Sequence, residues 1–194
     1  YWYNADLWKS ISEKDNLRKK FNIPADQFTI GSFQRDTEGS DLKTPKLSKG
    51  PDIFCDIVEK LDSKPHVVLA GWRRQYVINR LESAKIPYSY FEMASFETLN
   101  ELYNCLDLYL VTSRHEGGPQ AILECASNYT PILSTDVGFS RQVLNENSIC
   151  KDQQEFVKKI KSKDFNLTDH NYKKLQDYNM EKVMPLYIDF FKQI

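Results

Sequence analysis

Short apolar runs alternate with helical patterns along most of the chain. The runs lie at 28–33, 66–71, 88–92, 107–112 and 131–134, with a shorter one at 148–150. Segments with apolar positions three or four residues apart separate them, at 51–61, 73–84, 96–105 and from Pro119 onward. This alternation predicts βαβ units, which form a parallel sheet with helices on both faces. We therefore expect an α/β, Rossmann-like, doubly wound sheet of about six strands.

Further helical patterns flank the predicted sheet. Residues 10–22 predict a helix before the first strand, and 152–163 and 168–193 predict extra C-terminal helices. Pro185 should kink or break the last of these, because proline has no N–H and clashes with the preceding turn. The last helix carries more apolar residues than one domain face needs: Val183, Met184, Leu186, Tyr187, Phe190 and Phe191.

Length and composition exclude several classes of protein. The 194 residues suffice for one domain with a sizeable core, and a net charge of −1 argues against nucleic-acid binding. Four scattered cysteines without a C-x-x-C pair favour reduced core residues of a cytoplasmic protein. No apolar stretch is long enough for a membrane span, and no signal peptide is recognised. Because the chain begins at Tyr1 rather than Met, we expect a part of a longer protein.

The nine residues Glu116-Gly-Gly-Pro-Gln-Ala-Ile-Leu-Glu124 are the most informative segment. Two carboxylates bracket a turn that follows the predicted strand 107–112. Pro119 suits the first helical position, because it has no N–H to leave unpaired there and its φ is already helical. Gly117 and Gly118 let a ligand approach the backbone and leave free N–H groups at the positive end of a helix. The segment therefore predicts a strand, an anion-binding turn and a helix.

This arrangement resembles the Glu-x7-Glu motif of the retaining glycosyltransferases of family 4 (glycosyl transferases group 1), which have the GT-B fold. Residues 126–138 are similar to the family's continuation, which ends in Thr-Asp-Val-Gly, and residues 96–107 to its preceding helix. The resemblance covers roughly residues 28–145. It implies one half of a GT-B fold, the carboxy-terminal domain that binds the nucleotide-sugar donor.

The resemblance also implies a domain organisation. Asn4-Ala5-Asp6 is similar to the family's interdomain hinge motif with one residue missing, so residues 1–10 are expected to be a hinge remnant. Residues 11–194 would form the nucleotide-sugar-binding domain, with C-terminal helices from about residue 152. The amino-terminal, acceptor-binding domain would be missing from this chain.

The two glutamates have distinct roles in the family that the motif resembles. The residue matching Glu124 holds both ribose hydroxyls of the nucleotide, and the one matching Glu116 contacts hydroxyls of the donor sugar. The N–H groups of Gly117, Gly118 and Gln120 would point at the donor sugar or phosphate. From the residues alone, Glu124 on the wet face of its helix and a Glu116 that only complements the helix dipole remain alternatives.

Arg35 and Lys49 resemble the family's Gly-Arg…Lys-Gly pair, which grips the diphosphate. The chain departs from that pattern at Gln34, where the family usually has glycine, and in the fourteen residues 36–49, a stretch that the family crosses in a few. Lys46 and Lys43 therefore remain alternatives to Lys49.

The remaining expectations concern the nucleotide base and metal ions. Gly71, at the end of the second predicted strand, matches a glycine beside the nucleotide, and Phe91 to Met93 lie in the family's base-binding region. Trp72 could wall this site or serve only for packing. No Asp-x-Asp motif occurs in the chain, and Arg35 with Lys49 could neutralise a departing diphosphate. We therefore expect no metal and no other cofactor.

The resemblance implies an enzyme that moves a sugar from a nucleoside diphosphate to an acceptor hydroxyl with retention of configuration, in glycan, polysaccharide or glycolipid synthesis. The isolated chain is expected to bind donor without transferring sugar. A nucleotide-sugar 2-epimerase-like enzyme and a non-catalytic nucleotide-sugar-binding module remain alternatives. The sequence does not determine the base, the sugar or the acceptor.

Overall fold

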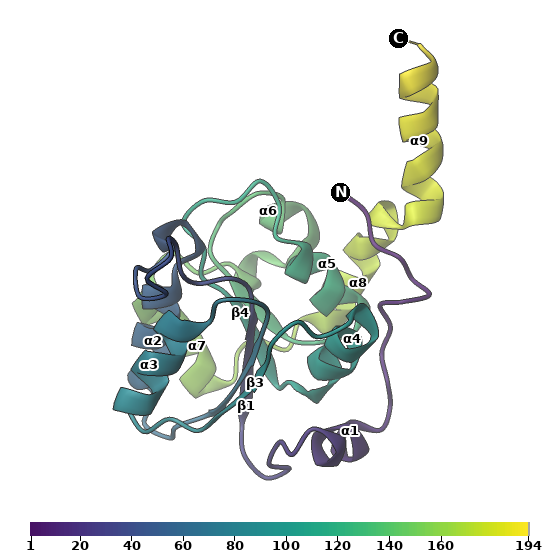
Figure 1. Ribbon diagram of the computed structural model, residues 1–194. Coiled ribbons are helices and arrows are strands. Elements are labelled where there is room, and N and C mark those ends of the chain that lie inside the picture. The colour runs from purple at the N-terminus through teal and green to yellow at the C-terminus, as the bar shows by residue number, and fades with distance from the viewer. Residues whose placement is uncertain (194) are drawn as a thin grey trace.

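A five-stranded parallel sheet forms the centre of the computed structural model, which describes residues 1–193 (Figure 1). Its strands are β1 (Thr29–Phe33), β2 (His66–Ala70), β3 (Tyr88–Phe91), β4 (Leu108–Val111) and β5 (Ile132–Ser134). They lie in the order β3-β2-β1-β4-β5, and all four pairings are parallel. The chain thus runs outward from β1 to β3 and returns to β4. This confirms the doubly wound α/β fold.

The sixth predicted strand is reduced to a single bridge. Ile149 pairs with Ser134 at one position only, and the Cys150 N–H donates to the Ser134 carbonyl at 2.8 Å. A 3-10 turn, η2 (Glu146–Ser148), precedes this bridge, and Asp152 already caps the next helix. Only residues 149–151 lie between these two elements, too few for more than this single bridge, so the sheet has five strands instead of about six.

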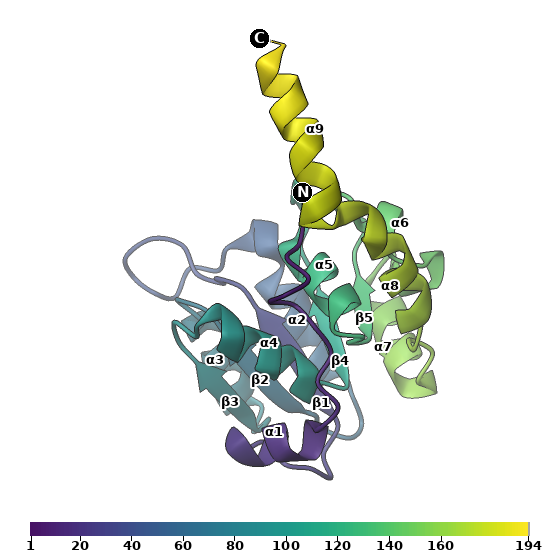
Figure 2. The ribbon, with the colours of Figure 1, turned by 90° about the vertical axis from the view of Figure 1, so that its right-hand side faces the viewer.

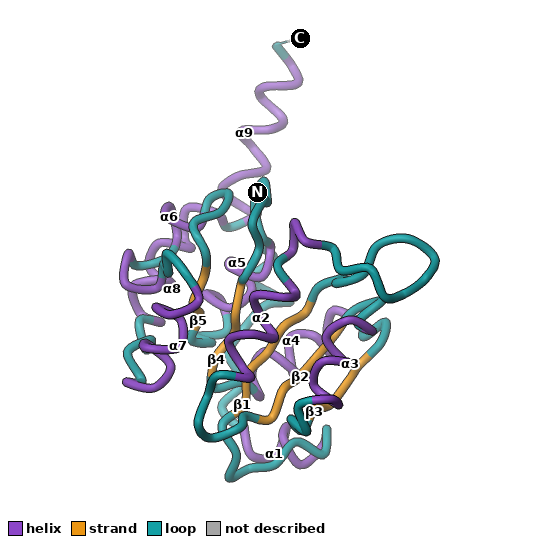
Figure 3. Tube along the Cα trace, turned by 90° about the vertical axis from the view of Figure 1, so that its left-hand side faces the viewer, coloured by secondary structure: helices purple, strands orange, loops and turns teal. Residues whose placement is uncertain are grey.

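Helices cover both faces of the sheet (Figure 3). One face carries α2 (Pro51–Glu59), α3 (Gln75–Ser83) and α7 (Gln153–Ser162). The other carries α1 (Lys14–Lys20), α4 (Phe96–Cys105), α5 (Gln120–Ser127), α6 (Ser140–Val143) and α8 (Thr168–Leu175). The first helix is shorter than the predicted 10–22. The remaining elements are η1 (Leu47–Lys49), η3 (Gln176–Tyr178) and α9 (Met180–Lys192).

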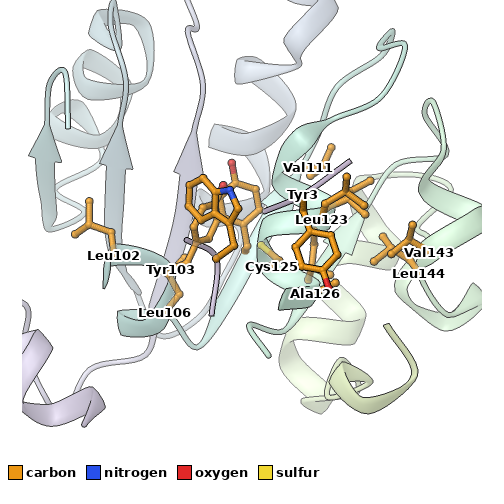
Figure 4. Packing of buried hydrophobic residues seen from close by; sticks show 14 of the residues in the cluster. Tyr3, Leu102, Tyr103, Leu106, Val111, Leu123, Cys125, Ala126, Val143 and Leu144 are labelled. Atoms are coloured by element: carbon orange, nitrogen blue, oxygen red, sulfur yellow. The ribbon is translucent and has the colours of Figure 1, made fainter. Parts of the chain in front are cut away.

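Alternate strand residues divide the core into two layers. Val67 and Leu69 face the α2 side, whereas Val68 and Ala70 face the α4 side, because side chains alternate along a strand. Figure 4 shows the second layer, in which Tyr103 of α4 lies near the side chains of α5. All four cysteines are buried and unpaired, as their scattered spacing predicted.

The C-terminal segment breaks at Asn179, and α9 continues through Pro185, so the predicted break there is wrong and the alternative of a kink stays a prediction. Asn179 is extended (φ −61°, ψ 132°), and its side chain accepts the Glu181 N–H at the start of α9. Backbone bonds on both sides of Asn179 join this segment to Tyr3: Tyr178 accepts the N–H of Tyr3, and Met180 donates to its carbonyl, both at 3.0 Å. Pro185 lies inside α9. The cap and the pairing with Tyr3 therefore set the break.

Residues 1–10 run along the domain, where Tyr3 and Trp8 are buried. The Lys9 and Ile11 N–H groups donate to the side chains of two α4 residues, Asn100 and Asn104. Whether this segment is a hinge remnant stays a prediction. Figure 2 shows α9 projecting from the body of the domain beside the start of the chain. Within residues 1–193, no helix combines the length and apolar character that a bilayer crossing requires.

Candidate functional site

A cavity of about 230 Å³ lies at the carboxyl ends of β1 and β4. These two strands are neighbours where the strand order changes direction, which is where open α/β sheets bind ligands. Four of the predicted site residues line it: Lys49, Glu116, Gln120 and Glu124. The structure therefore brings together side chains that are up to 75 residues apart (Lys49 to Glu124) in the sequence.

Lys49 and Glu116 form an ion pair on the cavity wall, with the Lys49 Nζ 2.8 Å from Oε1 of Glu116. The buried Ser113 hydroxyl donates to the same oxygen at 2.5 Å. The Glu116 side chain is 9% exposed and that of Lys49 28% exposed, so the pair is largely shielded yet borders the cavity. Shielding from water strengthens the attraction between these charges. Glu116 is therefore more than a complement to a helix dipole.

The turn that carries Lys49 packs directly on the end of β4. Gly50 has φ 62°, and a Cβ there would lie 1.8 Å from the Thr112 carbonyl oxygen, so only glycine fits. The Thr112 hydroxyl donates to the Gly50 carbonyl at 2.9 Å. The Ser48 carbonyl accepts the Arg114 N–H at 2.8 Å. These contacts fix η1 against the segment that leads to Glu116.

The turn after Glu116 differs in detail from the prediction. Pro119 is the N-cap of α5, with φ −65° and an extended ψ of 112°, and the helix begins one residue later. A Cβ at Gly118 would lie within 2.5 Å of the rings of Phe139 and Tyr1, so packing requires glycine there. Gly117 lines an adjoining depression of about 470 Å³. The predicted ligand contacts of the two glycines stay predictions.

Gln120 and Glu124 project from α5 towards the first cavity, which both line. The Gln120 side-chain amide donates to the Trp2 carbonyl at 2.8 Å. Oε2 of Glu124 accepts the Tyr103 hydroxyl at 2.6 Å. Burial raises the pKa of Glu124 to about 7, although the bond from Tyr103 opposes this shift. The carboxylate thus lies on the cavity wall rather than on a wet helix face.

Aromatic side chains that sequence reasoning missed also line the cavity. The ring of Phe33 lies 4.7 Å from that of Tyr103 and 5.4 Å from that of Tyr109. The Tyr109 hydroxyl accepts the Phe33 N–H at 2.8 Å. Burial holds the pKa of both tyrosines above the ordinary value. Tyr109 and Val111 lie on the same face of β4. The alternation of side chains along this strand could therefore have indicated that Tyr109 faces the site.

A second cavity of about 220 Å³ holds the residues predicted to lie beside the base. Gly71 and Met93 line it together with Phe33 and Leu99, which also line the first cavity, so the two are contiguous. The Phe91 side chain instead packs on Phe21, with ring centroids 5.4 Å apart. Its carbonyl accepts the Gly71 N–H at 3.2 Å. Phe91 can thus approach this cavity only through its backbone.

Arg35 does not line either cavity. Its guanidinium lies over the ring of Trp72, 5.4 Å from the centroid, and its Nε donates to the Thr37 carbonyl at 2.7 Å. Arg73 stacks on the same Trp72 ring at 4.2 Å. The structure therefore places Lys49, but not Arg35, beside Glu116. The diphosphate role of Arg35 stays a prediction.

The connection between β1 and η1 forms a hairpin that stands out from the domain (Figure 2). Thr37 pairs with Pro45, and the Lys46 N–H donates to the Asp36 carbonyl at 2.8 Å. At its base, Asp36 forms an ion pair with Arg74 at 2.9 Å, and both side chains are fully buried. Burial raises the pKa of Asp36 even though Arg74 opposes the shift. Sequence reasoning missed this pair.

Candidate metal ligands do not gather in the described part of the chain. Among residues 1–193, no group of three or more His, Cys, Asp or Glu side chains has a suitable arrangement. The ionisable Lys, Arg, Asp and Glu side chains among the residues that line the cavity are one amine and two carboxyls, from Lys49, Glu116 and Glu124. The expected metal independence stays a prediction.

Solved glycosyltransferases with the GT-B fold share this architecture. Sucrose-phosphate synthase from Thermosynechococcus elongatus superimposes with a TM-score of 0.78 at 16% identity, over 100% of this chain and 52% of its own. HepE from Anabaena, solved with UDP-glucose, gives 0.78 at 14% identity, over 99% and 56%. A C-terminal domain of the glycosyltransferase LpcC from Francisella tularensis gives 0.65 at 15% identity, over 95% and 98%.

Sequence comparison gives a consistent result. The O-antigen biosynthesis glycosyltransferase WclY of Escherichia coli is 22% identical over 160 residues, which span 75% of this chain and 42% of WclY. The chain thus spans less than half of that relative and about half of the first solved structures. The family model described as "Glycosyl transferases group 1" matches residues 42–162, more than half of the chain. The chain therefore belongs to the glycosyl transferases group 1 family.

Proposed function

We propose that this chain is the carboxy-terminal, donor-binding half of a retaining, metal-independent glycosyltransferase. The observation that carries the proposal is the convergence of Lys49, Glu116 and Glu124 on one cavity at the switch point of the sheet. An ammonium and two carboxylates there suit a ligand that has an anionic centre flanked by hydroxyl groups, which describes a nucleotide sugar.

Each part of the donor has a counterpart in the cavities. The Glu124 carboxylate would accept hydrogen bonds from the ribose hydroxyls, with Tyr103 holding one of its oxygens. Lys49 would meet the diphosphate, and Glu116 a hydroxyl of the sugar. The contiguous cavity beside Gly71 and Met93 would receive the base.

We propose a UDP-sugar as the donor. HepE, which has the same fold, was solved in complexes with UDP-glucose and with UDP. The cavity for the base is lined by apolar side chains and a glycine, so no charged side chain is available there to read the base. Recognition would rest on stacking and on backbone groups near Phe91.

The geometry favours a mechanism without a protein nucleophile. Glu116 accepts from both Lys49 and Ser113 at one oxygen, which makes its carboxylate a weak nucleophile and a well-oriented acceptor. Lys49 would stabilise the negative charge that develops on the departing diphosphate. That leaving group would accept the proton of the acceptor hydroxyl on the same face, and configuration would be retained.

The acceptor would be held by a second domain. Large apolar side chains are exposed on α9 and at the start of the chain, among them Leu186, Phe190, Phe191, Tyr1 and Trp2. These segments adjoin, since the amino group of Tyr1 donates to the Tyr187 hydroxyl at 3.4 Å. An apolar surface of this kind suits burial against the amino-terminal half of a longer, cytoplasmic enzyme of glycan, polysaccharide or glycolipid synthesis.

Donor binding can be tested with the chain as it is. UDP and UDP-sugars should raise its Tm in the presence of EDTA, since a ligand that binds only the folded state stabilises it. GDP and ADP serve as alternative nucleotides. Lys49→Met and Glu124→Gln should reduce the shift, whereas Lys43→Met, at the exposed hairpin tip, should not. No shift with any nucleotide, or a strict requirement for Mg²⁺ or Mn²⁺, would contradict the proposal.

Catalysis is tested separately. Labelled sugar transfer by the full-length protein should be abolished by Glu116→Ala and Glu124→Ala, and this chain alone should bind donor without transferring it, because the reactants must be held together. An epimerised sugar from a donor-only incubation would instead indicate a 2-epimerase, and a full-length protein that binds donor without any turnover would indicate a binding module.

A further inference from the structure

Two side chains from neighbouring strand ends contact the main-chain carbonyl of Lys49. The side-chain amide of Gln34, one residue beyond β1, donates to it at 3.0 Å. The Ser113 hydroxyl, two residues beyond β4, lies 3.5 Å from the same oxygen. Gln34 also lines the cavity that holds Lys49 and Glu116. The peptide group of Lys49 is thus attached to the sheet by side chains.

Only one of these two contacts can hold the carbonyl. A hydroxyl group has a single proton to donate. The Ser113 proton is committed to Glu116, because that contact is shorter, at 2.5 Å, and its acceptor is a charged carboxylate. Gln34 is therefore the side chain that secures the Lys49 carbonyl.

The turn that carries Lys49 is held from the β4 side through its neighbours and from the β1 side through the Gln34 bond. The connection of residues 36–49 is long, and the Lys49 N–H bonds to Lys46 within its own turn, at 2.8 Å. The neighbours Ser48 and Gly50 are held by the β4 side of the site. The Gln34 bond is the side-chain link between the Lys49 peptide and the β1 side.

We infer that Gln34 is a positioning residue that sets where the Lys49 ammonium lies against Glu116 and the donor diphosphate. The inference rests on the proposed function, and it gives a role to a residue where the resembled family usually has glycine. Gln34 acts through Lys49 and need not touch the nucleotide. Its effect should therefore appear in the affinity for phosphate and not in that for the nucleoside.

The test compares UDP with uridine, whose binding does not involve Lys49. Gln34→Met keeps the length of the side chain but removes the donor. We expect UDP affinity, measured by calorimetry, to fall about five- to tenfold, as for the loss of one hydrogen bond that orders a charged group. Uridine affinity should stay unchanged. In the Lys49→Met background, Gln34→Met should have no further effect on UDP binding.

Three results would overturn the inference: unchanged UDP affinity in Gln34→Met, an equal loss for UDP and uridine, or a full additional loss on top of Lys49→Met. Gln34→Asn, which shortens the side chain by one methylene, provides a second variant with the same expectations if the first does not fold. Failure of the wild-type chain to bind UDP would instead refute the proposed function itself.

Discussion

Two ion pairs lie at opposite ends of the β1–η1 connection, and they differ in their surroundings. Asp36 and Arg74 are both fully buried at its start. Lys49 and Glu116, at its end, are 28% and 9% exposed and border the cavity. An ion pair between a basic and an acidic side chain is therefore fully buried at one end of the connection and borders a cavity at the other.

The pairs also differ in how completely their donors are satisfied. Arg74 donates to Asp36, to both the carbonyl and the hydroxyl of Ser32, and to the Ala70 carbonyl. Lys49 has three ammonium protons, yet within residues 1–193 Glu116 is its ion-pair partner. A saturated pair maintains the structure, whereas an unsaturated pair beside a cavity retains the capacity to bind a ligand.

The largest expected effect is a loss of stability when the buried pair of Asp36 and Arg74 is broken. Arg74→Met leaves Asp36 buried without a charged partner, and we expect a loss of about 3–5 kcal/mol in the free energy of unfolding, measured by urea denaturation. Arg141→Met, which removes an exposed pair with Asp136, should cost less than about 1 kcal/mol. Equal losses of stability in the two variants would show that burial does not determine how much these ion pairs stabilise the fold.

Breaking the accessible pair should affect activity rather than stability. Lys49→Met in the full-length protein should lower kcat by about 10²- to 10³-fold, the usual loss when a preorganised charge-stabilising group is removed. The free energy of unfolding should fall less than in Arg74→Met, since Lys49 is partly exposed and Ser113 still donates to Glu116. Lys43→Met is the matched control. A stable variant with normal turnover would refute the role of Lys49.

A further expected effect is a pH dependence of stability to which Glu124 contributes. Its pKa rises from 4.5 to about 7 on folding, so between these values the folded state binds more protons than the unfolded state. The stabilising contribution is present below pH 4.5 and is lost as the pH rises through 7. Glu124→Gln removes this dependence. Between pH 4.5 and 8, the free energy of unfolding of the variant should therefore rise relative to that of the wild type, by up to about 3 kcal/mol.

Ligand binding should show the opposite trend at the same residue. Because the charged carboxylate is the better acceptor for ribose hydroxyls, uridine affinity should increase as the pH rises through 7. Uridine has no phosphate whose own ionisation would complicate the measurement. A flat profile for the wild-type chain, or the same slope in Glu124→Gln, would place the ribose elsewhere.

The sequence predicted those features that depend on local pattern. The apolar run at 66–71 predicted a strand, and the segment from Glu116 to Glu124 predicted a turn and a helix. Contacts between distant segments were missed, since no local pattern reports that Asp36 will meet Arg74. Pro185 misled for the same reason, because the pairing of distant Tyr3 set the break.

The hairpin between β1 and η1 has a consequence for how such chains diverge. Its base is closed by the Thr37–Pro45 pairing and by the Lys46 N–H bond to Asp36, so the tip can lengthen without moving the residues that follow. Lengthening a closed loop is inexpensive, at about 0.6 kcal/mol for each doubling. Insertions at Gly39 to Lys43 are therefore compatible with an unaltered site, and this tip is a natural place to attach a fluorescent reporter.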